Sequence, residues 1–217
     1  MLDWTSETYD TPTHTPAGMV ITGQSGLVSG THVASNMGWR AVEALSLGDL
    51  VLTFDHGMQP ITGIQREMLR FEPALAGQGG LPVFVPHGAL YNRCDIWLMP
   101  EQGILVESDA AQDVLGDPFA VVPAHTLTGF RGIRRACPPL ELEIITLSFA
   151  RDEVVYADGG MLTHCPRVRS ILSEPGEDAS LYDVLPDHDA RFLVECLVLQ
   201  AETQAFVFQP DEVACVA

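Results

Sequence analysis

The chain has 217 residues, of which 47% are hydrophobic, so it can bury a core in one large domain or in one domain with an extension. Its 29 acidic residues outnumber 11 basic ones and give a formal charge of −18. This charge excludes a phosphate-binding nucleic-acid surface and docking on an anionic membrane, and it suits a basic protein partner, cation-rich surroundings or simply a solvated acidic surface.

Residues 1–25 are predicted to form an extended arm, because Thr11-Pro12, Thr15-Pro16 and many hydroxyl side chains disfavour a helix. The first 17 residues have neither a basic n-region nor an apolar h-region, so we expect no signal peptide. No apolar run approaches the ~20 residues of a membrane span, and we expect no membrane insertion. The expected location is cytoplasmic, with association with a particle or non-classical export as alternatives.

From Gly26 onward, short β-type runs alternate with turn residues, which predicts a mainly all-β domain over residues 26–165. Three hairpin turns are expected at Asn36–Gly38, Asp55–Gly57 and Asp158–Gly160, where Asn, Asp and Gly suit tight turns. The loop at residues 77–80 reads as a plain connector. The expected strands are Thr31–Ser35, Trp39–Val42, Leu50–Phe54, Gln59–Glu67, Pro82–Val85, Asp95–Leu98, Ile104–Glu107, Glu141–Phe149, Glu153–Ala157 and Met161–His164.

Two helices interrupt or follow this β pattern. Ser108 and Gly116 have the side chains of an N-cap and a C-terminal stop, which predicts a short helix between them. Residues 166–217 are predicted to be a partly helical C-terminal extension, with a helix near 187–204 that Asp187 could cap. Residues 205–217 are expected to form a short strand and a tail.

The chain has five cysteines, at positions 94, 137, 165, 196 and 215, and none forms a CxxC pair. Free thiols in a reducing compartment are the simplest account. The histidines show no metal-binding spacing, and no nucleophile-elbow motif is present. We therefore expect no metal and no cofactor.

Two segments of the chain, Gly26–Ala34 with its continuation Trp39–Thr53, and Glu153–Cys165, together resemble the Hint superfamily, the β fold shared by inteins and hedgehog autoprocessing domains. Gly26–Ala34 and its continuation Trp39–Thr53 are similar to the opening block of the family, which contains a Gly-Thr step and a pattern ending in "GDxVLT". Glu153–Cys165 is similar to the closing block, a hairpin that ends in a histidine. Asp55–Ile61 resembles the "DHGxQPI" segment of bacterial Hint-domain proteins, and the resemblance covers residues 26–165.

The resemblance implies chemistry that begins with a Cys or Ser at the first position of the block, which attacks the preceding carbonyl. Here that position is Gly26, which has no side chain. Ser25 and Ser29 lie nearby but out of register, and an acyl shift depends on placement within about an ångström. Self-cleavage through a serine near residue 26 is therefore the alternative hypothesis.

The resemblance also implies a Thr/Ser-x-x-His motif that holds and protonates the scissile amide. The matching segment is Met99–Gln102, in which Met99 replaces the hydroxyl residue and Gln102 replaces the histidine. A glutamine forms hydrogen bonds but supplies no proton near neutral pH. Asp152 stands where the most similar relatives tend to have a histidine.

His164 matches the closing histidine, and Cys165 follows it where splicing proteins have an Asn or the downstream nucleophile. Without that Asn, succinimide cleavage is excluded. An adjacent imidazole can lower the pKa of a thiol, so a reactive Cys165 is a third hypothesis. Neighbours in a strand point to opposite faces, which favours an ordinary buried cysteine instead.

The leading hypothesis is a non-catalytic Hint-like structural or protein-binding module in which Gly26, Gln102, Asp152, His164 and Cys165 are vestigial positions. Arms without their own core usually gain order from a partner. We therefore expect a protein partner or a homo-oligomer, and a place in a larger assembly such as a phage-like or secreted particle. The alternative hypothesis is an autoprocessing domain.

Overall fold

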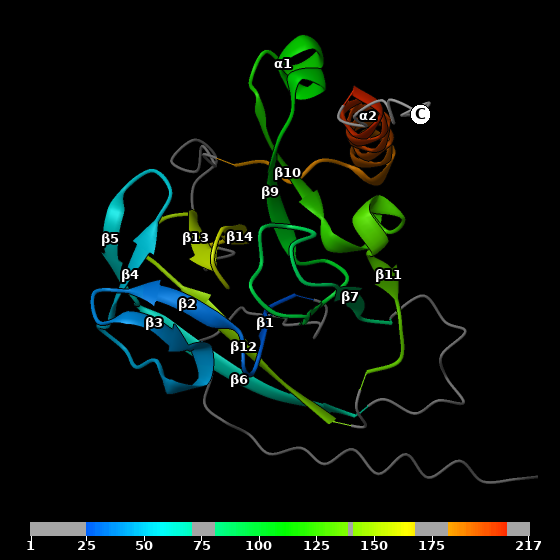
Figure 1. Cartoon of the computed structure of the whole chain (residues 1–217). Helices are drawn as coiled ribbons and strands as arrows, with labels where there is room; N and C mark the ends of the chain where they lie inside the picture. The colour runs from blue at the N-terminus through cyan, green and yellow to red at the C-terminus, as the bar shows by residue number, and fades with distance from the viewer. Residues whose placement is uncertain (1–24, 71–80, 139–140, 168–181, 208–217) are drawn as a thin grey trace, which may run out of the picture.

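The computed structural model describes residues 25–70, 81–138, 141–167 and 182–207, and the described strands form two antiparallel sheets (Figure 1). The expected mainly all-β fold is confirmed. In the first sheet the order is β11 (Arg134–Arg135), β7 (Val83–Val85), β8 (Ile96–Leu98), β1 (Leu27–Val28), β12 (Glu141–Ser148) and β6 (Gly63–Arg70). In the second it is β10 (Phe119–Pro123), β9 (Gly103–Glu107), β14 (Met161–Cys165), β13 (Glu153–Ala157), β2 (His32–Ser35), β4 (Leu50–Thr53) and β5 (Gly57–Pro60), with β3 (Gly38–Ala41) paired to β2.

The three expected hairpins are present, and their turns have the left-handed backbone that their residues permit. Gly38, Gly57 and Gly159 have φ angles of 89°, 66° and 113°. The turn between β4 and β5 is also closed by a side chain, since the Thr53 hydroxyl donates to the Gly57 carbonyl at 2.9 Å. Local turn chemistry therefore fixes these hairpins.

The expected single strand over Gln59–Glu67 is wrong, because this segment is split between β5 in one sheet and β6 in the other. Pro60 has no N–H to continue a ladder. The backbone then changes partner, with the Ile61 N–H donating to Asp49 O and the Thr62 N–H to Ser148 O. Ile61 is buried between the two ladders and turns the chain from one sheet to the next.

The short helix α1 (Asp109–Leu115) forms as expected. The Ser108 side chain accepts a hydrogen bond from Ala110 N, and Gly116 ends the helix in a left-handed conformation with φ 78°.

The long helix α2 (Asp187–Val207) is present but runs further than predicted, so the expected strand at residues 205–217 is wrong for Ala205–Val207. The strong helix formers before Val207 continue the helix. Asp187 is its first residue rather than its cap, and the Ala190 N–H bonds to the Pro186 carbonyl. Among the described residues, no helix has both the length and the apolar composition needed to cross a membrane.

Helix α2 shares a core with the β domain. Its buried residues Ala190, Leu193 and Val194 belong to the same apolar cluster as β7, β8 and β10. Figure 1 shows α1 and α2 side by side at the end of the molecule away from β3 and β6. The division at residue 165 stays a prediction. The predicted arm, except Ser25, and the loop at residues 77–80 lie outside the described residues.

One buried histidine joins the start of α2 to the β domain. His125, in a 3₁₀ turn (Ala124–Leu127), has Nδ1 at 3.0 Å from Pro100 O and Nε2 at 3.1 Å from both carboxylate oxygens of Asp187. We expect His125→Ala to lower the free energy of unfolding by about 2–4 kcal/mol, since it leaves a cavity and removes a charge-assisted hydrogen bond. Urea denaturation measures this loss, and proteolysis should cut α2 earlier.

The matched control for this prediction is His188→Ala on the same helix. His188 has a side chain that is 94% exposed, and its Nδ1 lies 3.2 Å from Asp189 Oδ1. Its replacement should change stability by less than about 0.5 kcal/mol. Equal effects of the two substitutions would contradict the role given to His125.

Candidate functional site

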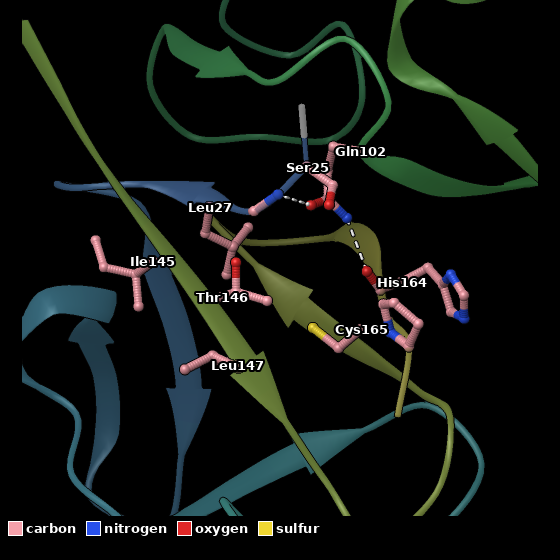
Figure 2. Close-up of a pocket in the computed structure, with 10 residues that line it drawn as sticks. Ser25, Leu27, Gln102, Ile145, Thr146, Leu147, His164 and Cys165 are labelled. Carbon is pink, nitrogen blue, oxygen red and sulfur yellow. Dashed lines mark hydrogen bonds between the residues drawn. The ribbon is translucent and has the colours of Figure 1, made fainter. Parts of the chain in front are cut away.

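The sequence-predicted positions Gly26, Gln102, His164 and Cys165 line one small cavity. Its volume is about 20 Å³, room for about one water molecule. Four segments form its walls: the entry to β1, the turn before β9, the middle of β12 and the end of β14 (Figure 2). The fold thus brings together four of the five positions. Asp152, the fifth, is not among the lining residues.

Gln102 is the centre of the site's hydrogen bonds. Its Oε1 accepts from the Gly26 N–H at 2.8 Å, and its Nε2 donates to the carbonyls of His164 at 2.7 Å and Gly103 at 3.2 Å. The side chain is buried, so these bonds satisfy polar groups that have little access to solvent. Gln102 therefore binds the Ser25–Gly26 amide at the position where the resemblance predicts a histidine. The atom that contacts the amide is Oε1, which accepts a hydrogen bond and has no proton to donate.

The backbone at Gly26 leaves no room for a nucleophilic side chain. Its φ is +125°, a conformation that L-residues rarely adopt, and an added Cβ would lie 2.6 Å from Ile144 Cγ2 and 3.0 Å from Thr146 Oγ1. Both neighbours come from β12, which pairs with β1 next to Gly26. The space next to the amide is thus filled from the opposite strand.

The two serines near this position differ in their surroundings. Ser25 lines the cavity, and its carbonyl belongs to the peptide bond whose N–H Gln102 holds. Ser29 lies outside the cavity lining, and its N–H donates to Glu143 O. If Ser25 were the nucleophile, the peptide bond that breaks would be the one between residues 24 and 25. Gln102 instead binds the N–H of the next peptide bond, Ser25–Gly26.

The other two substituted positions have structural contacts. Met99, at the hydroxyl position of the motif, is buried in an apolar cluster with Val28 and Ile144. Asp152 is buried, and its Oδ1 accepts from the Arg167 N–H at 2.7 Å, so its carboxylate holds the chain that leaves β14. Neither side chain is placed to act on the Gly26 amide.

His164 and Cys165 point to opposite faces of β14, as their positions in a strand require. Figure 2 shows the imidazole directed away from Ser25 and Gln102, and it lies 6.0 Å from the Tyr182 ring in an edge contact. Cys165 packs in the core cluster that contains Leu27 and Ile145. His164 contributes its backbone carbonyl to the site, not its ring.

Burial raises the pKa of the Cys165 thiol to about 12, and the nearby Glu153 carboxylate adds to this increase. Burial of the thiol, and the position of the imidazole on the opposite face of β14, count against the hypothesis of a thiol activated by its neighbouring imidazole. A thiol with such a pKa holds almost no thiolate at neutral pH.

Alkylation of the folded chain tests this point. We expect the exposed thiols of Cys94 and Cys137 to react with iodoacetamide at pH 7.5 at least about a hundredfold faster than Cys165, which should react only after unfolding. Peptide mass spectrometry of timed samples reads the order. A rate at Cys165 equal to that at Cys94 would restore the reactive-thiol hypothesis.

Two residues that close the site, Ile144 and Thr146, were not identified from the sequence. They lie in an ordinary β run, and no local pattern marks them as neighbours of Gly26. Only the pairing of β1 with β12, about 118 residues apart in the chain, brings them there. Within the described ranges, no three His, Cys, Asp or Glu side chains come close enough to hold a metal ion.

No curated protein matches the chain. Similar solved structures include a splice-inactive variant of the AceL NrdHF class 3 split intein, with 17% identity, 67% of this chain and 99% of that chain covered, and a TM-score of 0.40. An intein-like domain from Clostridium thermocellum has 16% identity, coverage of 64% and 98%, and a TM-score of 0.41. The MchDnaB-1 intein has 13% identity and a TM-score of 0.39, with 64% of this chain and 98% of that chain covered.

Identities of this size say nothing about activity. The family is shown by a family model: the model described as "Hint domain" matches residues 25–163, which is more than half of the chain. The match begins at Ser25, next to the amide that Gln102 holds, and ends within β14. The resemblance seen in the sequence is therefore confirmed: the chain belongs to the Hint domain family.

Proposed function

We propose that this chain is a non-catalytic Hint domain that serves as a structural or protein-binding module. The observation that carries the proposal is the closed space at Gly26, where β12 side chains stand within 3.0 Å of a built Cβ. A nucleophile at this position needs both a side chain and room to approach the neighbouring carbonyl. Gly26 has no side chain, and Ile144 and Thr146 fill the space that a nucleophilic side chain would need.

The hydrogen bonds of Gln102 support the same proposal. Cleavage of an amide requires a proton for the leaving nitrogen, and a carboxamide oxygen has none to give. The bonds from Gln102 to Gly26 and His164 instead join β1 to β14 across the two sheets. In this proposal the former processing site holds the domain together.

The net charge of −18 supports binding to a protein with a basic surface, since opposite charges speed encounter and exclude wrong partners. Large apolar side chains at the surface, such as Met37 and Leu47, add contact area that a partner can cover. A homo-oligomer, or a place in a larger assembly such as a phage-like or secreted particle, is consistent with this proposal.

The alternative is self-cleavage through Ser25, which is supported by its position on the cavity wall and by the family to which the chain belongs. Three features count against it. Gln102 binds the amide of Gly26, not that of Ser25, and the His164 ring points away from Ser25. The Asp152 carboxylate accepts a hydrogen bond from the Arg167 N–H.

Affinity purification of the tagged full chain from its native cells, followed by quantitative mass spectrometry, tests the binding half of the proposal. We expect one or a few proteins at near-stoichiometric amounts, or a defined homo-oligomer by analytical ultracentrifugation. A chain that purifies alone and sediments as a monomer at all concentrations would contradict it.

A further inference from the structure

The buried histidine at the start of α2 has oxygen acceptors on both of its ring nitrogens. The His125 side chain is 6% exposed, and its Nδ1 lies 3.0 Å from Pro100 O and 3.4 Å from Glu101 Oε1. Its Nε2 lies 3.1 Å from both carboxylate oxygens of Asp187. A carbonyl and an ionised carboxylate only accept hydrogen bonds, so each ring nitrogen must donate one. Only the doubly protonated imidazolium carries an N–H on both nitrogens.

Loss of one ring proton turns one of these contacts from attractive to repulsive, whichever nitrogen loses it. If Nε2 is bare, its lone pair faces the Asp187 carboxylate at 3.1 Å. If Nδ1 is bare, its lone pair faces Pro100 O and the Glu101 carboxylate. Because the ring is buried, little water reaches it to replace the lost bond. Deprotonation of His125 therefore weakens its hold on one of the two elements that it joins.

The charged groups around this ring are mainly acidic. Glu101, from the turn before β9, and Asp187, from the first turn of α2, are the described carboxylates within 4 Å of its nitrogens. Arg191 of α2 lies 3.9 Å from the Asp187 carboxylate. Strand β10, which leads into the turn of His125, has no ionisable side chain, and Arg131, in a second turn that contacts α2, has its own backbone and aromatic contacts. Two carboxylates beside the ring stabilise its charged form.

The two elements that His125 joins differ in what else holds them. The backbone N–H of His125 donates to Pro100 O at 3.0 Å, a bond that does not involve the ring. Helix α2, in contrast, has no backbone hydrogen bond to the β domain among the described residues. It is held by the Asp187 contact and by apolar side chains that share a core cluster with β10, namely Ala190, Leu193 and Val194. The start of α2 therefore depends on the protonated ring more than the turn before β9 does.

We propose that His125 is a pH-dependent latch, which holds α2 against the β domain while its ring is doubly protonated and loosens the helix as the pH rises. The latch is complete at acidic pH and is lost between about pH 6 and 8, the range in which histidine side chains titrate in proteins. Loosening of α2 exposes the apolar cluster beneath it. The inference goes beyond the proposed function, because it concerns the C-terminal helix and not the Gly26 site.

Two NMR measurements on the labelled full chain test the latch between about pH 5.5 and 8.5. Imidazole ¹⁵N shifts report how many protons the His125 ring carries, and the His125→Gln protein identifies its signals. Hydrogen-exchange protection factors of Leu193 and Val194, corrected for the intrinsic effect of pH on exchange, report the docking of α2. We expect these factors to fall about tenfold or more as the ring loses one proton. The Ile145 amide in β12 should change by less than about twofold.

Three variants separate the latch from a general loss of stability. Asp187→Asn offers an amide N–H to a bare Nε2, so the neutral ring still has a partner and the fall in protection should shrink to less than about threefold. Asp189→Asn is the matched control on the same helix, because its carboxylate lies beside the exposed His188, and it should keep the full fall. His125→Gln should remove the pH dependence, whatever the protection of its α2.

Four results would overturn the inference: equal protection of α2 at both ends of the pH range, a fall that does not coincide with the loss of a ring proton from His125, the same fall in Asp187→Asn as in the parent, or a fall that Ile145 shares. None of these results bears on the proposed function, which rests on the closed space at Gly26. Conversely, self-cleavage at Ser25 would remove the proposed function and leave the latch in place.

Discussion

Replacing Gly26 with alanine is expected to lower the free energy of unfolding by about 3 kcal/mol or more. Two costs combine at this position. An L-residue at φ +125° is strained, and its Cβ would overlap Ile144 Cγ2 at 2.6 Å. Urea denaturation of the full chain measures the sum.

Gly30→Ala is the matched control, because it introduces the backbone strain of a positive φ without a steric overlap of the new Cβ. Gly30 has φ +93°, but a built Cβ there meets nothing within 4 Å. We expect a loss of about 1–2 kcal/mol from backbone strain alone. A Gly26→Ala protein as stable as the Gly30→Ala protein would show that β12 leaves room at the site, and the account of a closed site would be wrong.

Gln102→Ala is expected to cost about 2–4 kcal/mol of stability. The change leaves the Gly26 N–H and the His164 carbonyl buried without their partner, and each unsatisfied group costs about 1–3 kcal/mol. The Gly26 amide proton should also exchange with solvent faster, since the bond that protects it is gone. Denaturant titration and hydrogen exchange by NMR measure the two effects.

Gln112→Ala, an exposed position on α1, provides the comparison and should stay within about 0.5 kcal/mol of the parent. Gln102→His keeps an acceptor for Gly26 and should recover part of the loss. If Gln102→Ala matches the parent in both stability and exchange, then the glutamine does not join the sheets.

Local sequence chemistry predicted much of the fold. The turn residues of the three hairpins and the Ser108 cap act within a few residues, so their effect could be read from the chain. The strands β1 and β11 have two residues each, too short for a hydrophobic pattern, and exist only through their partners. The break between β5 and β6 likewise depends on which strand each half meets.

The candidate site divides in the same way. The substitutions at Gly26 and Gln102 were identified from linear motifs. In the structure the two residues are joined by a hydrogen bond from the Gly26 N–H to Gln102 Oε1. What closes the site was not predictable, because Ile144 and Thr146 reach Gly26 across a strand pair that is distant in sequence. The thiol of Cys165 needed its three-dimensional surroundings, since burial raises its pKa.

The central claim is that the Ser25–Gly26 amide is held and not cleaved. Intact mass spectrometry of the purified full chain, incubated for days at neutral pH with and without dithiothreitol or hydroxylamine, tests it most directly. The account predicts a single species with the mass of the uncleaved chain under every condition. Fragments that divide the chain near residue 25 or residue 165, and that increase with the added nucleophile, would contradict it.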